Sequence, residues 1–232
     1  MSRWISVLLA VVVVTSGLGG CATVTDSYVT MDKSTQATMT PDAALAALKQ
    51  GNNRFVSGAM VKRDLMKQVK ATGYGQYPLA SVVSCIDSRA GPEIVFDQGI
   101  GDVFSARVAG NFVNEDILGS LEFASKAAGA KLIVVLGHTS CGAIKGACDD
   151  VVLGNLTAML TRIKPAVASV NFAGDRTSKN DAFVQMVAEA NVKRTVNEIR
   201  LKSPVLRAMA DAGEIRIVGA MLDVKTGAVT WY

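Results

Sequence analysis

Apolar residues form four short runs along the chain, at residues 79–84, 103–108, 131–136 and 215–222. The runs at 79–84 and 131–136 are nearly continuous, and the run at 103–108 is the weakest. Continuous apolar runs of this length are typical of strands buried on both faces, as in the centre of a parallel sheet. The pattern therefore predicts four strands, of which 131–136 is the clearest.

Helical spacing of apolar residues occupies the segments between these runs. The longest segment, 181–202, places Val184, Ala188 and Val192 on one face. Shorter helices are predicted at 41–51, 116–128, 141–150 and 156–167, with another starting at Ser203-Pro204. Because strands alternate with helices, the sequence predicts an α/β fold, a mainly parallel β-sheet flanked by helices. We expect one domain over residues 40–232.

The first twenty residues have the character of an export signal. One positive residue, Arg3, precedes an uninterrupted apolar run of ten residues at 5–14, and small residues follow. Ten residues in a helix rise about 15 Å, roughly half the hydrocarbon thickness of a bilayer. The run is therefore too short to span a membrane, and residues 1–20 are expected to be a signal peptide.

Leu-Gly-Gly-Cys at 18–21 resembles the lipobox of bacterial lipoproteins. That resemblance implies an acylated Cys21 as the mature N-terminus and a periplasmic protein anchored to a membrane through its lipid. The alternative is ordinary cleavage near Ala22, which would discard Cys21. Residues 21–39 are rich in Thr and Ser and lack an apolar period, so we expect a flexible tether.

Composition excludes several classes of function. The chain is 50% hydrophobic, which excludes wholesale disorder. Its 24 Lys and Arg against 20 Asp and Glu are mixed along the sequence, without the basic block typical of nucleic-acid-binding proteins. The single histidine, His138, excludes any mechanism that needs two.

Three cysteines remain if Cys21 carries a lipid, and an odd number does not suit a disulfide framework. Cys85 follows one predicted strand, while His138 and Cys141 follow another. Because sites in parallel sheets form beyond the carboxyl ends of the strands, these side chains should meet. Two thiolates and an imidazole are a catalytic-type zinc set with the fourth position open. The alternative is two buried thiols and a core histidine.

Cys-Ile-Asp-Ser-Arg at 85–89 and His-Thr-Ser-Cys-Gly at 138–142 resemble the two signatures of the β-class carbonic anhydrases. Further agreement lies at 92–93, 101–104, 107–111, 191–195, 203–206 and 217–220. The resemblance implies the fold of that family and one zinc per chain on Cys85, His138 and Cys141. It also implies reversible hydration of CO2 to bicarbonate and a proton by a zinc-bound hydroxide.

The same resemblance implies roles for other residues. Asp87 would face the fourth zinc position, and Arg89 would hold that carboxylate away from the metal. Gln76 and Gly142 would contact CO2 or bicarbonate. Family members also imply a homodimer or a dimer of dimers, in which the helix from Pro41 reaches across to the partner.

Two alternatives remain beside carbonic anhydrase activity. A relative on the same scaffold could hydrolyse carbonyl sulfide or carbon disulfide, which are linear like CO2. A non-catalytic zinc-binding lipoprotein or thiol-redox protein is a different class. The Asp87–Arg89 pair argues against passive zinc binding, and the lack of a Cys-x-x-Cys motif argues against redox exchange.

Overall fold

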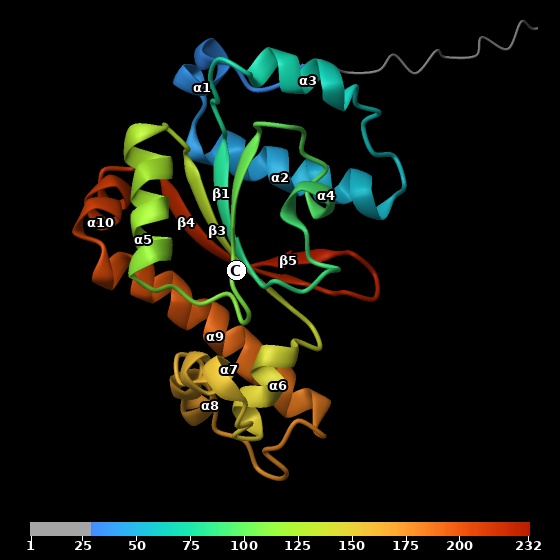
Figure 1. The fold of residues 1–232 in the computed structure, drawn as a ribbon, viewed down its shortest axis with the longest axis vertical. Helices are drawn as coiled ribbons and strands as arrows, with labels where there is room; N and C mark the ends of the chain where they lie inside the picture. Colours follow the sequence, from blue (N-terminus) through green and yellow to red (C-terminus); the bar gives the residue numbers. More distant parts are fainter. Residues whose placement is uncertain (1–28) are drawn as a thin grey trace, which may run out of the picture.

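A computed structural model describes residues 29–232. Its core is a five-stranded sheet in the order β2-β1-β3-β4-β5, shown in Figure 1. The strands are β1 (Ala80–Ser84), β2 (Val103–Arg107), β3 (Leu132–His138), β4 (Arg216–Leu222) and β5 (Val229–Trp231). The first four are parallel, and β5 runs antiparallel to β4. The predicted α/β class and its four parallel strands are confirmed.

Helices cover both faces of the sheet. They are α1 (Lys33–Thr38), α2 (Pro41–Val56), α3 (Leu65–Thr72), α4 (Pro92–Val95), α5 (Glu115–Glu122), α6 (Gly142–Cys148), α7 (Gly154–Leu160), α8 (Lys164–Ser169), α9 (Asp181–Lys202) and α10 (Pro204–Asp211). A π-helical turn, Phe123–Ala127, continues α5. Figure 1 shows α6, α7 and α8 gathered around one end of α9.

Alternate residues of the strands point to opposite faces of the sheet and pack into two separate hydrophobic cores. Val83, Ile133 and Val135 pack with residues of α5, α6, α9 and α10 on one face. Val82 and Val134 pack with α2 and α4 on the other. Both faces of the central strands are therefore buried, which explains why their sequences are continuously apolar.

The helix from Pro41 does not end near Gly51, as expected, but continues to Val56. A Cβ at Gly51 would lie 1.8 Å from the carbonyl oxygen of Phe96. This glycine is a point of close approach between α2 and the end of α4 rather than a helix terminator.

The elements differ from expectation in two other respects. The single helix expected at 156–167 is two helices, α7 and α8, because Pro165 lies in the first turn of α8 and cannot continue a helix from the preceding residues. Helices α1, α3 and α4 and strand β5 were not predicted, since each is short.

The segment expected as a tether over 21–39 is folded in its described part, from residue 29 onward. There α1 begins at an Asp32 cap, and the buried Gln36 donates hydrogen bonds to the carbonyls of Pro78 and Ala128 at 2.8 and 2.9 Å. The amide of Met31 donates to Asp102 at 2.9 Å. These contacts are long-range and polar, so they leave no periodic pattern of apolar residues in the sequence from which they could be predicted.

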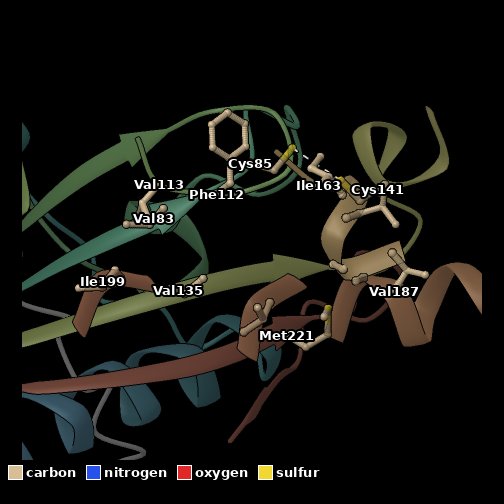
Figure 2. Packing of buried hydrophobic residues seen from close by; sticks show 14 of the residues in the cluster. Val83, Cys85, Phe112, Val113, Val135, Cys141, Ile163, Val187, Ile199 and Met221 are labelled. Atoms are coloured by element: carbon tan, nitrogen blue, oxygen red, sulfur yellow. Dashed lines mark hydrogen bonds between the residues drawn. The ribbon is translucent and has the colours of Figure 1, made fainter. Parts of the chain in front are cut away.

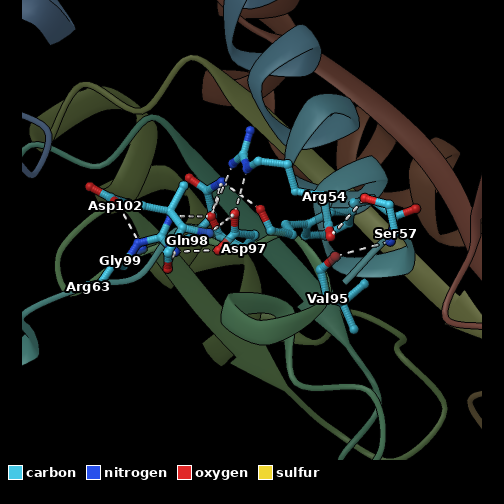
Figure 3. A network of polar contacts seen from close by, with 11 residues as sticks. Arg54, Ser57, Arg63, Val95, Asp97, Gln98, Gly99 and Asp102 are labelled. Carbon is cyan, nitrogen blue, oxygen red and sulfur yellow. Dashed lines mark hydrogen bonds and ion pairs between the residues drawn. The ribbon is translucent and has the colours of Figure 1, made fainter. Parts of the chain in front are cut away.

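A buried carboxylate fastens α2 to the end of α4 (Figure 3). The side chain of Asp97 is fully buried and accepts hydrogen bonds from Arg54 Nε at 2.5 Å and from Arg63. Burial alone would raise the pKa of Asp97, but the two guanidinium groups outweigh it and lower that pKa. The pair of arginines therefore keeps this carboxylate ionised inside the fold.

Candidate metal centre and active site

The site forms where β1 and β3 end. The sheet register pairs Ser84 with Leu136, so Cys85 and His138 leave neighbouring strands at the same edge. Ser140 then adopts a left-handed conformation, with φ +56°, and the chain turns so that Cys141 precedes α6. A non-glycine residue in this conformation is uncommon and is found mostly in tight turns and functional sites.

Cys85, His138 and Cys141 converge in the interior. Their ligand atoms lie within 4.8 Å of one another, and the two sulfurs are 3.9 Å apart (Figure 2). The three residues are only 4%, 1% and 1% exposed. His138 Nε2 has no hydrogen-bond partner among the described residues. A buried polar atom left without a partner is costly, so this nitrogen is arranged for a ligand that is not part of the chain.

The histidine is held in the tautomer that a metal requires. Nδ1 of His138 lies 2.9 Å from the carbonyl oxygen of Thr139. A carbonyl only accepts, so Nδ1 carries the hydrogen, and in the neutral ring Nε2 keeps a lone pair that a metal can bind. Burial alone would lower the pKa of His138, but the neighbouring Cys85 sulfur raises it. The hydrogen bond between the two sulfur atoms lowers the pKa of Cys85 and raises that of Cys141.

This donor set fits zinc. Two soft sulfurs and one imidazole suit zinc far better than magnesium or calcium, which prefer oxygen ligands. Three protein ligands leave one tetrahedral position open, the arrangement of catalytic rather than structural zinc sites.

Asp87 and Arg89 form a clamped pair beside these residues. Arg89 Nε donates to Asp87 Oδ1 at 2.9 Å and Nη2 donates to Oδ2 at 2.8 Å, while the Arg89 amide adds a third bond at 2.9 Å. Oδ2 of Asp87 lies 3.9 Å from His138 Nε2. Hydrogen bonds from Arg89 hold the pKa of Asp87 well below its usual range, although burial opposes them.

Sequence reasoning assigned no role to three residues that hold the segment carrying Cys85 and Asp87. Arg107, at the end of β2, donates to the carbonyl oxygens of Cys85 at 3.0 Å and Asp87 at 2.6 Å. The Gly110 amide donates to the Cys85 sulfur at 3.4 Å, and Asn191 donates to the Gly110 carbonyl at 2.7 Å. Arg107 and Asn191 both fall inside the segments that resemble the family. That resemblance is the only feature of the sequence that points to a role for them.

The remaining predicted residues lie as follows. Gly142 is the exposed first residue of α6, directly after Cys141. Gln76 is exposed on the loop before β1, at the end of the strands opposite the metal set. Cys148 is half-buried at the end of α6, away from the other two thiols. Cys21 lies outside the described residues.

Comparisons with known proteins agree with this geometry. The sequence profile of the carbonic anhydrase family matches residues 80–229. Carbonic anhydrase 2 of Mycobacterium tuberculosis is 36% identical over 193 residues, covering 81% of this chain and 90% of that protein. The β-carbonic anhydrase CafA of Aspergillus fumigatus superposes with a TM-score of 0.62 at 27% identity, covering 82% of this chain and 89% of that one.

A tetrameric β-carbonic anhydrase from Sordaria macrospora shares the fold, with a TM-score of 0.61, 22% identity, and coverage of 70% of this chain and 84% of that one. The fold and the site thus define a metal-dependent α/β enzyme. The chain belongs to the carbonic anhydrase family, whose members interconvert CO2 and bicarbonate, and within it to the β class.

Proposed function

We propose that this chain catalyses the reversible hydration of CO2 with one zinc ion held by Cys85, His138 and Cys141. The observation that carries the proposal is the meeting of two buried sulfurs and a partnerless imidazole nitrogen next to a clamped carboxylate. A passive zinc site has no use for that carboxylate.

A bound zinc ion would supply a water acidic enough to act as a nucleophile near neutral pH. The chain's own residues would then orient the reaction. Asp87 is ionised, so it can only accept a hydrogen, and its Oδ2 faces the ligand atoms. Both of its oxygens accept bonds from Arg89, which holds the carboxylate in one orientation and would keep it from ligating a bound metal.

Release of the proton has to proceed without a second histidine, because His138 is the only one in the chain. We infer that buffer or water takes the proton from the site. The backbone N–H of Gly142, adjacent to Cys141, is the group we assign to an oxygen of bicarbonate.

Stopped-flow CO2 hydration combined with metal analysis tests the proposal. We expect one zinc per chain and CO2 hydration by the zinc-loaded protein. Full zinc without CO2 hydration would instead support a hydrolase of carbonyl sulfide or carbon disulfide, and both substrates should be assayed in the same preparation.

A pair of cysteine variants tests the ligand set. Cys141→Ser should lose metal and activity together, because a hydroxyl is a poor substitute for a thiolate on zinc. Cys148→Ser removes the thiol at the far end of α6, away from the site, and should retain both metal and activity. A Cys141→Ser protein with stoichiometric zinc would contradict the assignment.

We also propose that the chain acts as a homodimer or a dimer of dimers. Strand β2 is an edge of the sheet, and a cavity of about 650 Å³ lies between it and α5. Phe123, 57% exposed, flanks this cavity and packs edge-on against Phe104. Since Gln76 lies at the far end of its own strands, it would contact substrate only at the site of a partner copy.

The last part of the proposal concerns location. We propose export to the periplasm and a lipid anchor at Cys21, supported by the apolar run at 5–14 and by Leu-Gly-Gly-Cys at 18–21. Within residues 29–232, no helix has the length and apolar character needed to cross a bilayer. Intact-mass analysis of membrane extracts should detect an acylated Cys21, and Cys21→Ser should release the protein. An unmodified soluble mature form would contradict the anchor.

A further inference from the structure

A chain of two hydrogen bonds connects the long helix α9 to one of the metal-binding sulfurs. Asn191, in the middle of α9, donates from Nδ2 to the carbonyl oxygen of Gly110 at 2.7 Å. The backbone N–H of Gly110 donates in turn to Cys85 Sγ at 3.4 Å. Asn191 is 1% exposed, so its amide is sequestered from solvent.

The conformation and the surroundings of Gly110 both require a glycine. Its φ of +82° is a conformation that glycine adopts readily and other residues rarely do. A Cβ there would lie 2.4 Å from Cδ1 of Ile163. The next amide, of Asn111, closes the turn by donating to the Val108 carbonyl at 2.9 Å. The turn therefore brings the Gly110 N–H close to the sulfur, and the bond from Asn191 to the Gly110 carbonyl holds this residue in that orientation.

Burial of the Asn191 side chain has a cost in folding free energy. Its neighbours on α9, Val187, Ala188 and Val192, belong to the apolar core on this face of the sheet. Burying an amide among such residues costs free energy unless it gains a hydrogen bond, and an apolar side chain would pack there without that cost. The bond to Gly110 is the contact that distinguishes Asn191 from its neighbours.

We propose that Asn191 is a positioning residue that aims the Gly110 N–H at the Cys85 sulfur and so weakens electron donation from that thiolate to the bound metal. A hydrogen bond to a metal-bound sulfur stabilises its lone pairs, which leaves the metal more electrophilic. Two thiolate ligands make the metal less electrophilic, and a hydrogen bond to one of the sulfurs partly reverses that effect. The inference rests on the metal site proposed above.

Cadmium provides a readout that does not depend on CO2 chemistry, because thiolate–cadmium charge transfer absorbs in the ultraviolet. The full-length protein is loaded with Cd²⁺ as the wild type, as Asn191→Ala and as Asn52→Ala. Asn52 is the matched control: it is also a buried helical asparagine, and its Nδ2 donates to the carbonyls of Val95 and Gly227 at 3.0 and 2.8 Å, in the other core.

We expect the charge-transfer band of Asn191→Ala to shift to longer wavelength, since sulfur lone pairs that lose a hydrogen bond are easier to excite. The zinc forms should show the corresponding change in activity, with the midpoint of kcat/KM against pH moved upward in Asn191→Ala only. Asn52→Ala should lose stability but keep the wild-type band. An unchanged band in Asn191→Ala, or the same shift in both variants, would overturn the proposal.

A measurement on the wild type keeps the proposal testable if Asn191→Ala does not fold. In protein labelled with ¹⁵N and loaded with ¹¹³Cd, the Gly110 amide proton should show scalar coupling to the metal through the hydrogen bond to Cys85. Absence of that coupling in a cadmium-loaded sample would overturn the proposal. A wild type that binds no cadmium would contradict the metal site itself, and the inference with it.

Discussion

In the proposed mechanism the Asp87 carboxylate has two competing partners: the guanidinium of Arg89, which holds it, and a bound metal ion, which it would ligate if released. The bidentate bond from Arg89 favours the first arrangement. Arg89 is half exposed, so its contribution to folding stability is small, and its effect is on the orientation of Asp87.

Arg89→Ala should therefore leave the metal bound and lower kcat/KM for CO2 by on the order of 10²-fold, the size typical of a misplaced acid–base group. Metal analysis and stopped-flow assays on the same sample measure both effects. Arg200→Ala, which breaks a surface pair with Asp211 elsewhere, is the control and should retain full activity. A fully active Arg89→Ala would show that Asp87 needs no clamp.

The pH dependence of activity follows from which groups change charge. Hydrogen bonds from Arg89 lower the pKa of Asp87, so this carboxylate is ionised throughout the neutral pH range. Its ion pair with Arg89 is lost only in strong acid. Between about pH 6 and pH 9, the rise of kcat/KM with pH therefore reports the water at the metal and its coupled neighbours.

A water bound to zinc with three imidazole ligands has a pKa of about 7. Two thiolates donate more charge to the metal than imidazoles do, so the bound water is less acidic. The apparent pKa of the activity should therefore lie above roughly 7. Stopped-flow rates across this range measure it. A flat profile would contradict the proposed activation of water.

At the scale of elements, the contact between α2 and α4 depends on a missing side chain. Gly51→Ala would place a Cβ against the Phe96 backbone, which cannot move aside as a flexible side chain could. We expect a loss of about 1–3 kcal/mol in the free energy of unfolding, as for other overpacked sites.

Gly146→Ala, in the interior of α6, is the matched control because the nearest atom to a Cβ there is Leu160 Cδ1 at 3.4 Å, an ordinary van der Waals contact. It should be neutral or stabilising by up to about 1 kcal/mol, as alanine favours helices. Denaturant unfolding of both variants measures the difference. Equal stabilities would mean that α2 shifts freely over α4.

For the whole molecule, the β2 edge and the groove beside α5 are the surface we assign to a second copy of the chain. Light scattering of the wild type should give a dimer or tetramer. Phe123→Glu should shift it toward monomer and reduce activity, because a charge cannot be buried there without a partner. Val152→Glu, an equally drastic change on the exposed loop between α6 and α7, should alter neither property. A fully active wild-type monomer would contradict the assembly.

Sequence alone was sufficient for the parts of this protein governed by local pattern. The central strands β1 and β3 are continuously apolar because they are buried on both faces. Parallel strands deliver the residues after them to one edge, so the meeting of Cys85, His138 and Cys141 could be predicted. The bounds of α9 were also predicted, since its apolar spacing is long and regular.

Tertiary structure decided what depends on contacts between distant segments. Position 51 lies inside a helix, and it is a glycine because the backbone of Phe96 approaches it closely. Helix α1 packs through polar hydrogen bonds, which leave no apolar period in the sequence. Asn191 meets Gly110 across 81 residues of sequence. A hydrogen bond between such positions leaves no periodic trace, because it needs only one donor and one acceptor brought together by the packing of α9 on the sheet.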